Sequence, residues 1–354
     1  MLTDIFAARY AAVAIWPNYG EPERRLLVQT FRIVKEQLFP YWTDEGKERQ
    51  GAAVTWTSMH DKLAMELGLN ELSARGYFQK VNLLGNEHNQ WHALAIPFIC
   101  QNFVCEQYPD AAVPDAFIKE RLSFIEIAFR DKESQLAQAN AELPAKIAKA
   151  ALDAKRVPPR GQIRVGGGDP EDAMRALNRL QNQSFAESVK ELNARFQQAG
   201  ARLNYHNGFI QLSDDQQIQQ RIDTPFWALV KEPKWKNVDT DMKAAFDLRD
   251  TCGRDPAFYA ARALESAVKI ISDEKGWSHG GERSAHNYID NLFAKKNGFI
   301  MRWEHDSLKA IFTDIRNPFG HGPGSAAMPA LTPQQTDWAL AACMSWVRSL
   351  IGRM

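Results

Sequence analysis

Apolar residues recur with the period of an α-helix through much of the C-terminal hundred residues, and this periodicity constrains the fold more than any other feature. The segment DPAFYAARALESAVKII opens with Asp255 and Pro256, a pair typical of a helix start. One helical face of this segment collects Phe258, Ala261, Leu264, Val268 and Ile271. A buried helix is therefore expected from Asp255 onward.

Three more helices are predicted after this one in the sequence. The second covers 282–296, and the third covers 301–316 with an apolar stripe of its own. The fourth follows TPQQ at 332–335, which has the spacing of a capping box. Four helices of about 15 to 20 residues predict a compact helical bundle over 251–354.

The N-terminal part is also predicted to be helical. Between residues 21 and 130, helix-length amphipathic segments alternate with short polar breaks, as over 22–38, 56–69 and 114–128. No alternation typical of strands competes with them. We expect a helical N-terminal regulatory or sensor domain over 1–140.

The middle of the chain has a different composition. Pro, Gly and basic residues gather between Pro158 and Pro170, which predicts a flexible linker over 141–172. Residues 173–250 are predicted to form a small α+β connector with one β-hairpin at 201–213. The expected fold class is therefore mainly α.

The hairpin is predicted from ARLNYHNGFIQLS. A two-residue type I′ turn at Asn207-Gly208 pairs Tyr205 with Ile210, so that both strands have apolar side chains on one face. Ser213 and Gln216 then resemble a capping box at the start of a further helix.

Charge and composition limit the function classes. The chain has 43 basic and 43 acidic residues, so any site for a polyanion must be local. No signal peptide or long apolar stretch is present, which predicts a soluble, cytoplasmic protein. Four scattered cysteines match neither a disulfide framework nor a metal knuckle and are expected to be reduced.

The segment IRNPFGHG ends the third predicted bundle helix. Pro318 disfavours helical geometry at Asn317, so the helix is expected to end close to Arg316, with His321 in or beyond the turn. Glycines around His321 would permit close approach of a ligand. The alternative is a helix stop whose arginine meets the helix dipole and whose histidine is an ordinary surface residue.

At these residues the sequence resembles the HEPN superfamily, whose nucleases carry a motif written RxxxxH in its shortest form. Residues 316–321, RNPFGH, fit that form and follow the third helix of a four-helix unit. The segment YHNGFIQ and the leading helical region also resemble abortive-infection proteins of the AbiJ type, which join a variable N-terminal region to a C-terminal HEPN domain.

The resemblance implies metal-independent RNA cleavage without a cofactor. His321 can exchange a proton with the ribose 2′-OH or the leaving 5′-oxygen, and Arg316 can stabilise charge on the phosphate. Asn317 can fix the phosphate or orient His321. The products are a 2′,3′-cyclic phosphate and a 5′-OH.

The same resemblance implies a homodimer with a composite active site, because one histidine cannot readily serve as base and acid together. It also implies a toxin-like effector in anti-phage defence that cuts RNA after a phage-derived trigger. The competing interpretation is a non-catalytic HEPN module that binds RNA or protein.

Other polar groups are weaker candidates. Arg262, Glu265 and Lys269 form a line beside the apolar stripe of the first bundle helix, so Glu265 is an auxiliary candidate; the alternative is a solvated or dimer-facing stripe. The basic residues near the linker could contact RNA, or could simply be a solvated helix end: Lys155, Arg156, Arg160 and Arg164.

Two further patterns favour structural explanations. His88 and His92 have the i, i+4 spacing that suits zinc on a helix, but no third ligand is evident and no metal site is predicted. Gly166-Gly167-Gly168 lacks the lysine of a phosphate-binding loop and is interpreted as a turn. A metal-dependent hydrolase would need a ligand cluster that the sequence does not offer.

Overall fold

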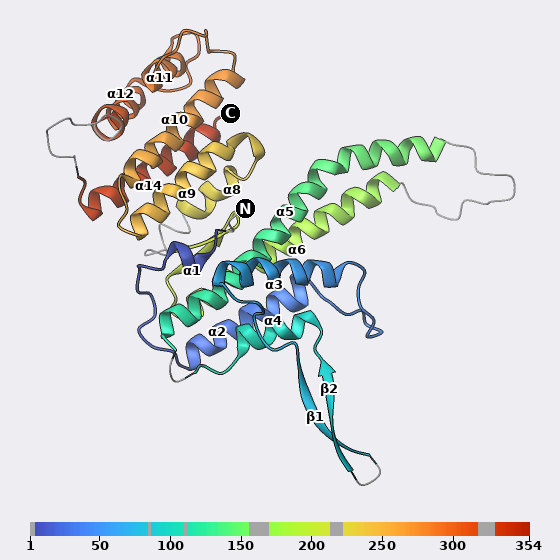
Figure 1. Cartoon of the computed structure of the whole chain (residues 1–354). Coiled ribbons are helices and arrows are strands. Elements are labelled where there is room, and N and C mark those ends of the chain that lie inside the picture. The colour runs from blue at the N-terminus through green and yellow to red at the C-terminus, as the bar shows by residue number, and fades with distance from the viewer. Residues whose placement is uncertain (1–3, 84–85, 110–111, 156–169, 213–221, 318–329) are drawn as a thin grey trace. The chain divides into compact units, whose positions relative to one another are not determined.

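The structure, a computed structural model, is mainly helical, which confirms the predicted fold class (Figure 1). It describes residues 4–83, 86–109, 112–155, 170–212, 222–317 and 330–354. Two compact units divide the chain, Met1–Ile210 and Gln211–Met354. Within the described ranges, no helix has the length and apolar character needed to cross a bilayer.

The first unit is built around α5, whose first half is buried on several sides. Phe124 of α5 lies 6.1 Å from the ring of Trp56 and 6.0 Å from the ring of Phe31, so three helices meet in one aromatic cluster. The helices that pack here, with the π-helical turn η1, are α1 (Phe6–Arg9), α2 (Glu21–Arg32), η1 (Ile33–Leu38), α3 (Ala52–Leu67), α4 (Ile96–Cys105) and α5 (Pro114–Lys155).

The second half of α5 corrects the predicted linker. Residues 141–155 continue the helix, although Pro144 lies inside it, because α5 packs along α6 (Pro170–Gln198). Asn140 of α5 exchanges side-chain hydrogen bonds with Asn178 and Asn182 of α6 at 2.7–3.1 Å. The segment 156–169, with its glycine run, lies outside the described residues.

The predicted hairpin is confirmed. Strands β3 (Leu203–His206) and β4 (Phe209–Leu212) are joined by Asn207 and Gly208, whose φ values of 42° and 87° are those of a type I′ turn. Asn193 of α6 fixes the first strand, because its amide donates to the carbonyl of Tyr205 and accepts from its N–H. The capping box predicted at Ser213 lies outside the described residues.

A second hairpin was not predicted. Strands β1 (Gly76–Leu83) and β2 (Asn86–Ala93) pair antiparallel and extend away from α3 and α4 (Figure 1). Phe78 lies opposite Trp91 with ring centroids 4.9 Å apart. Such aromatic pairs depend on which residues of the two strands lie opposite each other. The order of residues along the sequence alone therefore did not indicate strands. His88 and His92 therefore lie on a strand, not on a helix.

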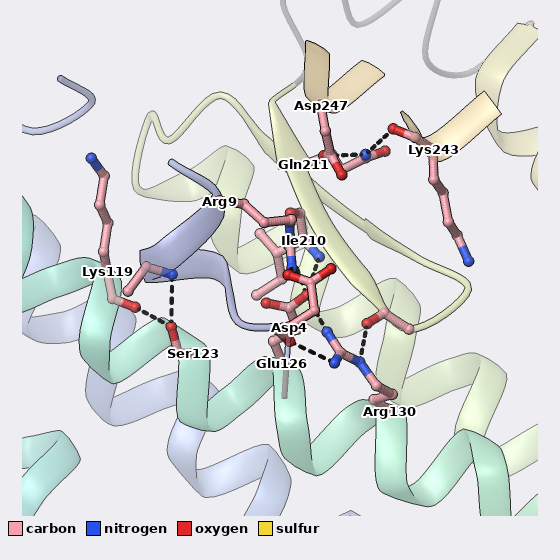
Figure 2. Close-up of polar contacts among 12 residues, drawn as sticks. Asp4, Arg9, Lys119, Ser123, Glu126, Arg130, Ile210, Gln211, Lys243 and Asp247 are labelled. Atoms are coloured by element: carbon pink, nitrogen blue, oxygen red, sulfur yellow. Dashed lines mark hydrogen bonds and ion pairs between the residues drawn. The ribbon is translucent and has the colours of Figure 1, made fainter. Parts of the chain in front are cut away.

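A buried ion network holds the start of the chain to α5 and β4 (Figure 2). The fully buried carboxylate of Glu126 accepts from Arg9 at 2.8 Å and from Arg130 at 2.7 Å. Arg9 also donates to the carbonyl of Ile210, and Arg130 to that of Gly208. Burial raises the pKa of Glu126, so the two guanidiniums are needed to keep its charge compatible with the interior.

The second unit is organised around α10 (Pro256–Glu274), which contacts helices on several sides (Figure 1). Its other elements are α8 (Thr224–Leu229), η3 (Pro233–Trp235), α9 (Lys236–Asp250), α11 (Ala285–Phe293), α12 (Arg302–Ala310), η4 (Ile311–Arg316) and α14 (Pro333–Ile351). The boundary between the two units falls inside the predicted connector of residues 173–250. In the first unit α6 packs on α5, whereas in the second unit α9 packs on α10. Val238, Met242 and Ala245 give α9 an apolar face that the bundle needs.

The predicted bundle helices are present at the expected places. Thr332 accepts from the N–H of Gln335, and the Gln335 side chain accepts from the N–H of Thr332, as a capping box requires. Two details differ. The second helix, α11, is shorter than predicted, and Asp255 precedes α10 in a left-handed conformation without a side-chain capping bond.

Replacing Glu126 tests the buried network. We expect Glu126→Ala to lower the free energy of unfolding by about 3 kcal/mol, because two guanidiniums lose their buried partner. Urea unfolding of the full chain measures this. Glu142→Ala, which breaks the exposed pair with Lys146 on the same helix, is the control and should leave the unfolding curve unchanged. Equal curves for both variants would refute the structural role of Glu126.

Candidate functional site

The motif lies where α12 passes into the π-helical turn η4. The N–H of Asn317 bonds to the carbonyl of Phe312, five residues earlier, which is the pattern of a π-helix. Asn317 has φ −68° and ψ −42°, so helical geometry reaches the last described residue before Pro318. The element ends at Arg316, as predicted, but the expected departure from helical geometry at Asn317 is not seen. The bias imposed by a following proline is a preference that local packing can override.

Arg316 is held by contacts on three sides. Its Nη2 lies 3.3 Å from Oε2 of Glu265, and its Nη1 lies 3.4 Å from Oδ1 of Asn317. The guanidinium carbon is 5.9 Å from the ring centre of Phe258. Its Nε is buried without a hydrogen-bond partner among the described residues, while the side chain as a whole is 30% exposed. Arg316 thus combines a fixed position with access to solvent.

Glu265 of α10 is the buried carboxylate at this place. Its Oε1 lies 2.8 Å from Nζ of Lys269, and its Oε2 faces Arg316. Arg262 turns away and pairs with Asp241 of α9, with Nε 2.9 Å from Oδ2. The predicted polar line on α10 is therefore divided: two of its members face the motif arginine or its partner, and the third ties α10 to α9.

A cavity of about 80 Å³ opens beside Arg316. Residues from α10, from the start of α11 and from η4 line it: Glu265, Arg283, Ser284, Ala285, His286, Phe312, Arg316 and Asn317. The structure thus brings Arg316, Asn317 and Glu265 together, as the sequence suggested. Arg283 and His286 were missed. Their only signal in the sequence is an arginine and a histidine three residues apart at a helix start.

His286 is oriented by the third helix. Its Nε2 lies 3.3 Å from the carbonyl oxygen of Lys309 and 3.3 Å from Oγ1 of Thr313. Since a carbonyl can only accept, Nε2 carries the proton in this arrangement. Nδ1 is then the basic nitrogen, and among the described residues it has no hydrogen-bond partner. His286 is a second titratable side chain at the cavity, with a defined orientation.

Several predicted site residues cannot be placed. His321, Arg156, Arg160 and Arg164 lie outside the described residues, and Lys155 is described only as the last residue of α5. In the part of the chain that is described, no group of three or more His, Cys, Asp or Glu side chains is arranged to hold a metal ion.

A comparison with protein families finds a match that covers the first part of the chain. The family model described as AbiJ N-terminal domain 4 matches residues 4–228, which is more than half of the chain. No curated protein and no solved structure matches this chain. The matched range ends before α9, so the cavity and the motif lie outside it.

The Glu265 contacts can be tested without an activity assay. We expect Glu265→Gln to lower the free energy of unfolding by about 1 kcal/mol, because two cations lose a buried partner that solvent screens only in part. Urea unfolding measures the change. Glu274→Gln on the same helix, which removes an exposed pair with Lys234, is the matched control. If the two variants were equally stable, the Glu265 ion pairs would not hold this site together.

Proposed function

Because this chain belongs to the AbiJ N-terminal domain 4 family of abortive-infection proteins, we propose that its second unit is a HEPN-type endoribonuclease. The reaction is metal-independent attack of a ribose 2′-OH on the adjacent phosphate. It leaves a 2′,3′-cyclic phosphate and a 5′-OH, which limits the substrate to RNA. The protein acts in the cytoplasm as a toxin-like effector of anti-phage defence.

The observation that carries this proposal is the environment of Arg316. A guanidinium cannot lose its proton near neutral pH, and its planar donors match the oxygens of a phosphate. Here the guanidinium is fixed by Glu265 and Asn317 at the edge of a cavity. A fixed cation stabilises the charge that develops on the phosphate without having to reorganise during the reaction.

His321 supplies the proton transfer in this proposal. It follows Arg316 at the RxxxxH spacing, and its ordinary pKa range suits both acceptance and donation of a proton. Asn317 either contacts the phosphate or orients His321. Support for His321 comes from the sequence motif alone, and support for Arg316 comes from both the motif and the cavity.

The reaction needs a second acid–base group. One must accept the 2′-OH proton while another donates to the leaving oxygen, and a single histidine does not serve both roles in one step. We propose a homodimer in which two copies of the motif meet and each contributes His321. His286, which lines the cavity beside Arg316, can also exchange a proton. A test must therefore distinguish His286 from His321 of the partner subunit.

The first unit is proposed to regulate the second. An enzyme that cuts cellular RNA harms its own cell unless it is restrained, and the matched family domain makes up most of the rest of the chain. A phage-derived trigger would release this restraint. The basic residues Lys155, Arg156, Arg160 and Arg164 are proposed as further contacts to RNA phosphates.

Cleavage of RNA tests the proposal directly. In EDTA, with phage lysate added as a trigger in a parallel arm, we expect the wild type to produce cyclic-phosphate ends from tRNA, mRNA or ribosomal RNA. Arg316→Ala and His321→Ala should each reduce the rate by about 100-fold or more, because each removes a group that acts on the transition state. The ends are identified by their resistance to 3′-end ligation until the cyclic phosphate has been opened and the resulting phosphate removed.

Two exposed residues of the same unit provide the controls. Arg302→Ala removes a surface arginine paired with Asp306, and His279→Ala removes a surface histidine; both should cleave at the wild-type rate. Identical RNA from wild type and all variants, with and without lysate, would exclude catalysis. It would favour the non-catalytic binding module, and cleavage that needs a divalent metal would contradict the proposed mechanism.

The composite site makes a separate prediction. When His321→Ala is co-expressed with wild type at constant total protein, activity should fall with the square of the wild-type fraction, because mixed dimers lack one histidine. His286→Gln keeps a side-chain N–H for the Lys309 carbonyl and should retain cleavage. A linear fall together with an inactive His286→Gln would instead assign the second acid–base group to His286 and reject the composite site.

A further inference from the structure

The cavity beside Arg316 carries more positive charge than its carboxylate balances. Two guanidiniums line it, from Arg283 and Arg316, and Glu265 is the single acidic residue among its described lining residues. Glu265 is itself shared with Lys269. Lys269 and Arg316 share this carboxylate, and Arg283 adds a further positive charge at the cavity, which favours binding of an anion at this place.

Arg283 is available to that anion. It precedes α11, its side chain is exposed, and within the described residues its guanidinium pairs with no carboxylate. The neighbouring Glu282 makes no ion pair with Arg283 in the described structure; its Oε1 accepts from the N–H of His279 at 2.7 Å and from Asn291 at 2.8 Å. These bonds lower the pKa of Glu282 to about 2.

The size of the cavity limits the anion. The cavity measures about 80 Å³. Pockets that enclose a whole drug-sized ligand measure roughly 300 Å³ or more. A single tetrahedral oxyanion on a longer chain suits this space, with the rest of the chain outside.

We propose that Arg283 and Arg316, from two different elements of the second unit, bind the same phosphate group of an RNA strand. The proposal rests on the proposed function, because it takes RNA as the substrate and adds a binding residue outside the RxxxxH motif. Arg316 acts on the phosphate that reacts, and Arg283 holds that phosphate in the ground state as well. Arg283 therefore contributes to affinity without reading the bases.

The test measures RNA binding by the full-length protein. A fluorescent single-stranded 12-nucleotide RNA is titrated at several salt concentrations, in a His321→Ala background that prevents cleavage. We expect Arg283→Ala to weaken binding by about tenfold and to reduce the slope of log K against log salt by about 0.7, as loss of one phosphate contact on a single strand does. Arg283→Lys should keep the slope, and Arg302→Ala is the matched arginine control.

A double variant tests whether the phosphate is shared. If both guanidiniums bind one group, Arg283→Ala together with Arg316→Ala should weaken binding by less than the product of the two single effects. Effects that multiply fully would show two separate phosphates and overturn the shared site. Binding by Arg283→Ala equal to that of Arg302→Ala would overturn any role for Arg283.

Results with the His321→Ala protein distinguish failure of this proposal from failure of the proposed function. If His321→Ala binds no RNA at any salt concentration, the RNA-directed function fails and the phosphate site fails with it. If it binds RNA and wild type cleaves, while Arg283→Ala behaves as the control, only the assignment of Arg283 is lost. Because Arg283 is exposed and makes no side-chain ion pair in the described structure, its variants should fold, and circular dichroism verifies this.

Discussion

Burial of Glu265 on α10 is the constraint around which the candidate site is arranged. A carboxylate placed among helices must have partners, since an unpaired buried charge is very costly. Lys269 reaches one oxygen from the same helix, and Arg316 reaches the other from η4. The requirement to pair one buried acid therefore fixes the arginine of the motif, and it does so through the bundle itself rather than through the segment that carries His321.

The helix that carries Arg316 has to satisfy two demands. Leu308, Ile311, Phe312 and Ile315 are buried in the bundle, so the same helix must pack tightly and then present a cation at its end. The π-helical turn η4 lies at this transition, and such turns are frequent at functional sites. His286 is tied to the carbonyl of Lys309, just before the turn, so α11 and η4 fix each other where the cavity forms.

Local signals made much of the fold predictable. The hairpin at 203–212 follows from Asn207-Gly208, whose positive φ values belong to a type I′ turn, and the last helix follows from the capping box at Thr332. The β1–β2 hairpin escaped prediction because its support comes from pairs such as Phe78 with Trp91, which depend on register. Arg283 and His286 escaped for a related reason: a cavity assembled from three helices leaves no pattern in any one of them.

The family and the chemistry rest on different residues. The AbiJ match covers 4–228, whereas Glu265, Arg283 and Arg316 all lie beyond it. The family membership therefore does not depend on the cavity, and the charges that suit a phosphate lie outside the matched range. Their combination is informative because a charge arrangement suited to a phosphate lies next to a nuclease-like motif in a chain of an abortive-infection family. Together they lead from membership of an abortive-infection family to the proposed cleavage of RNA.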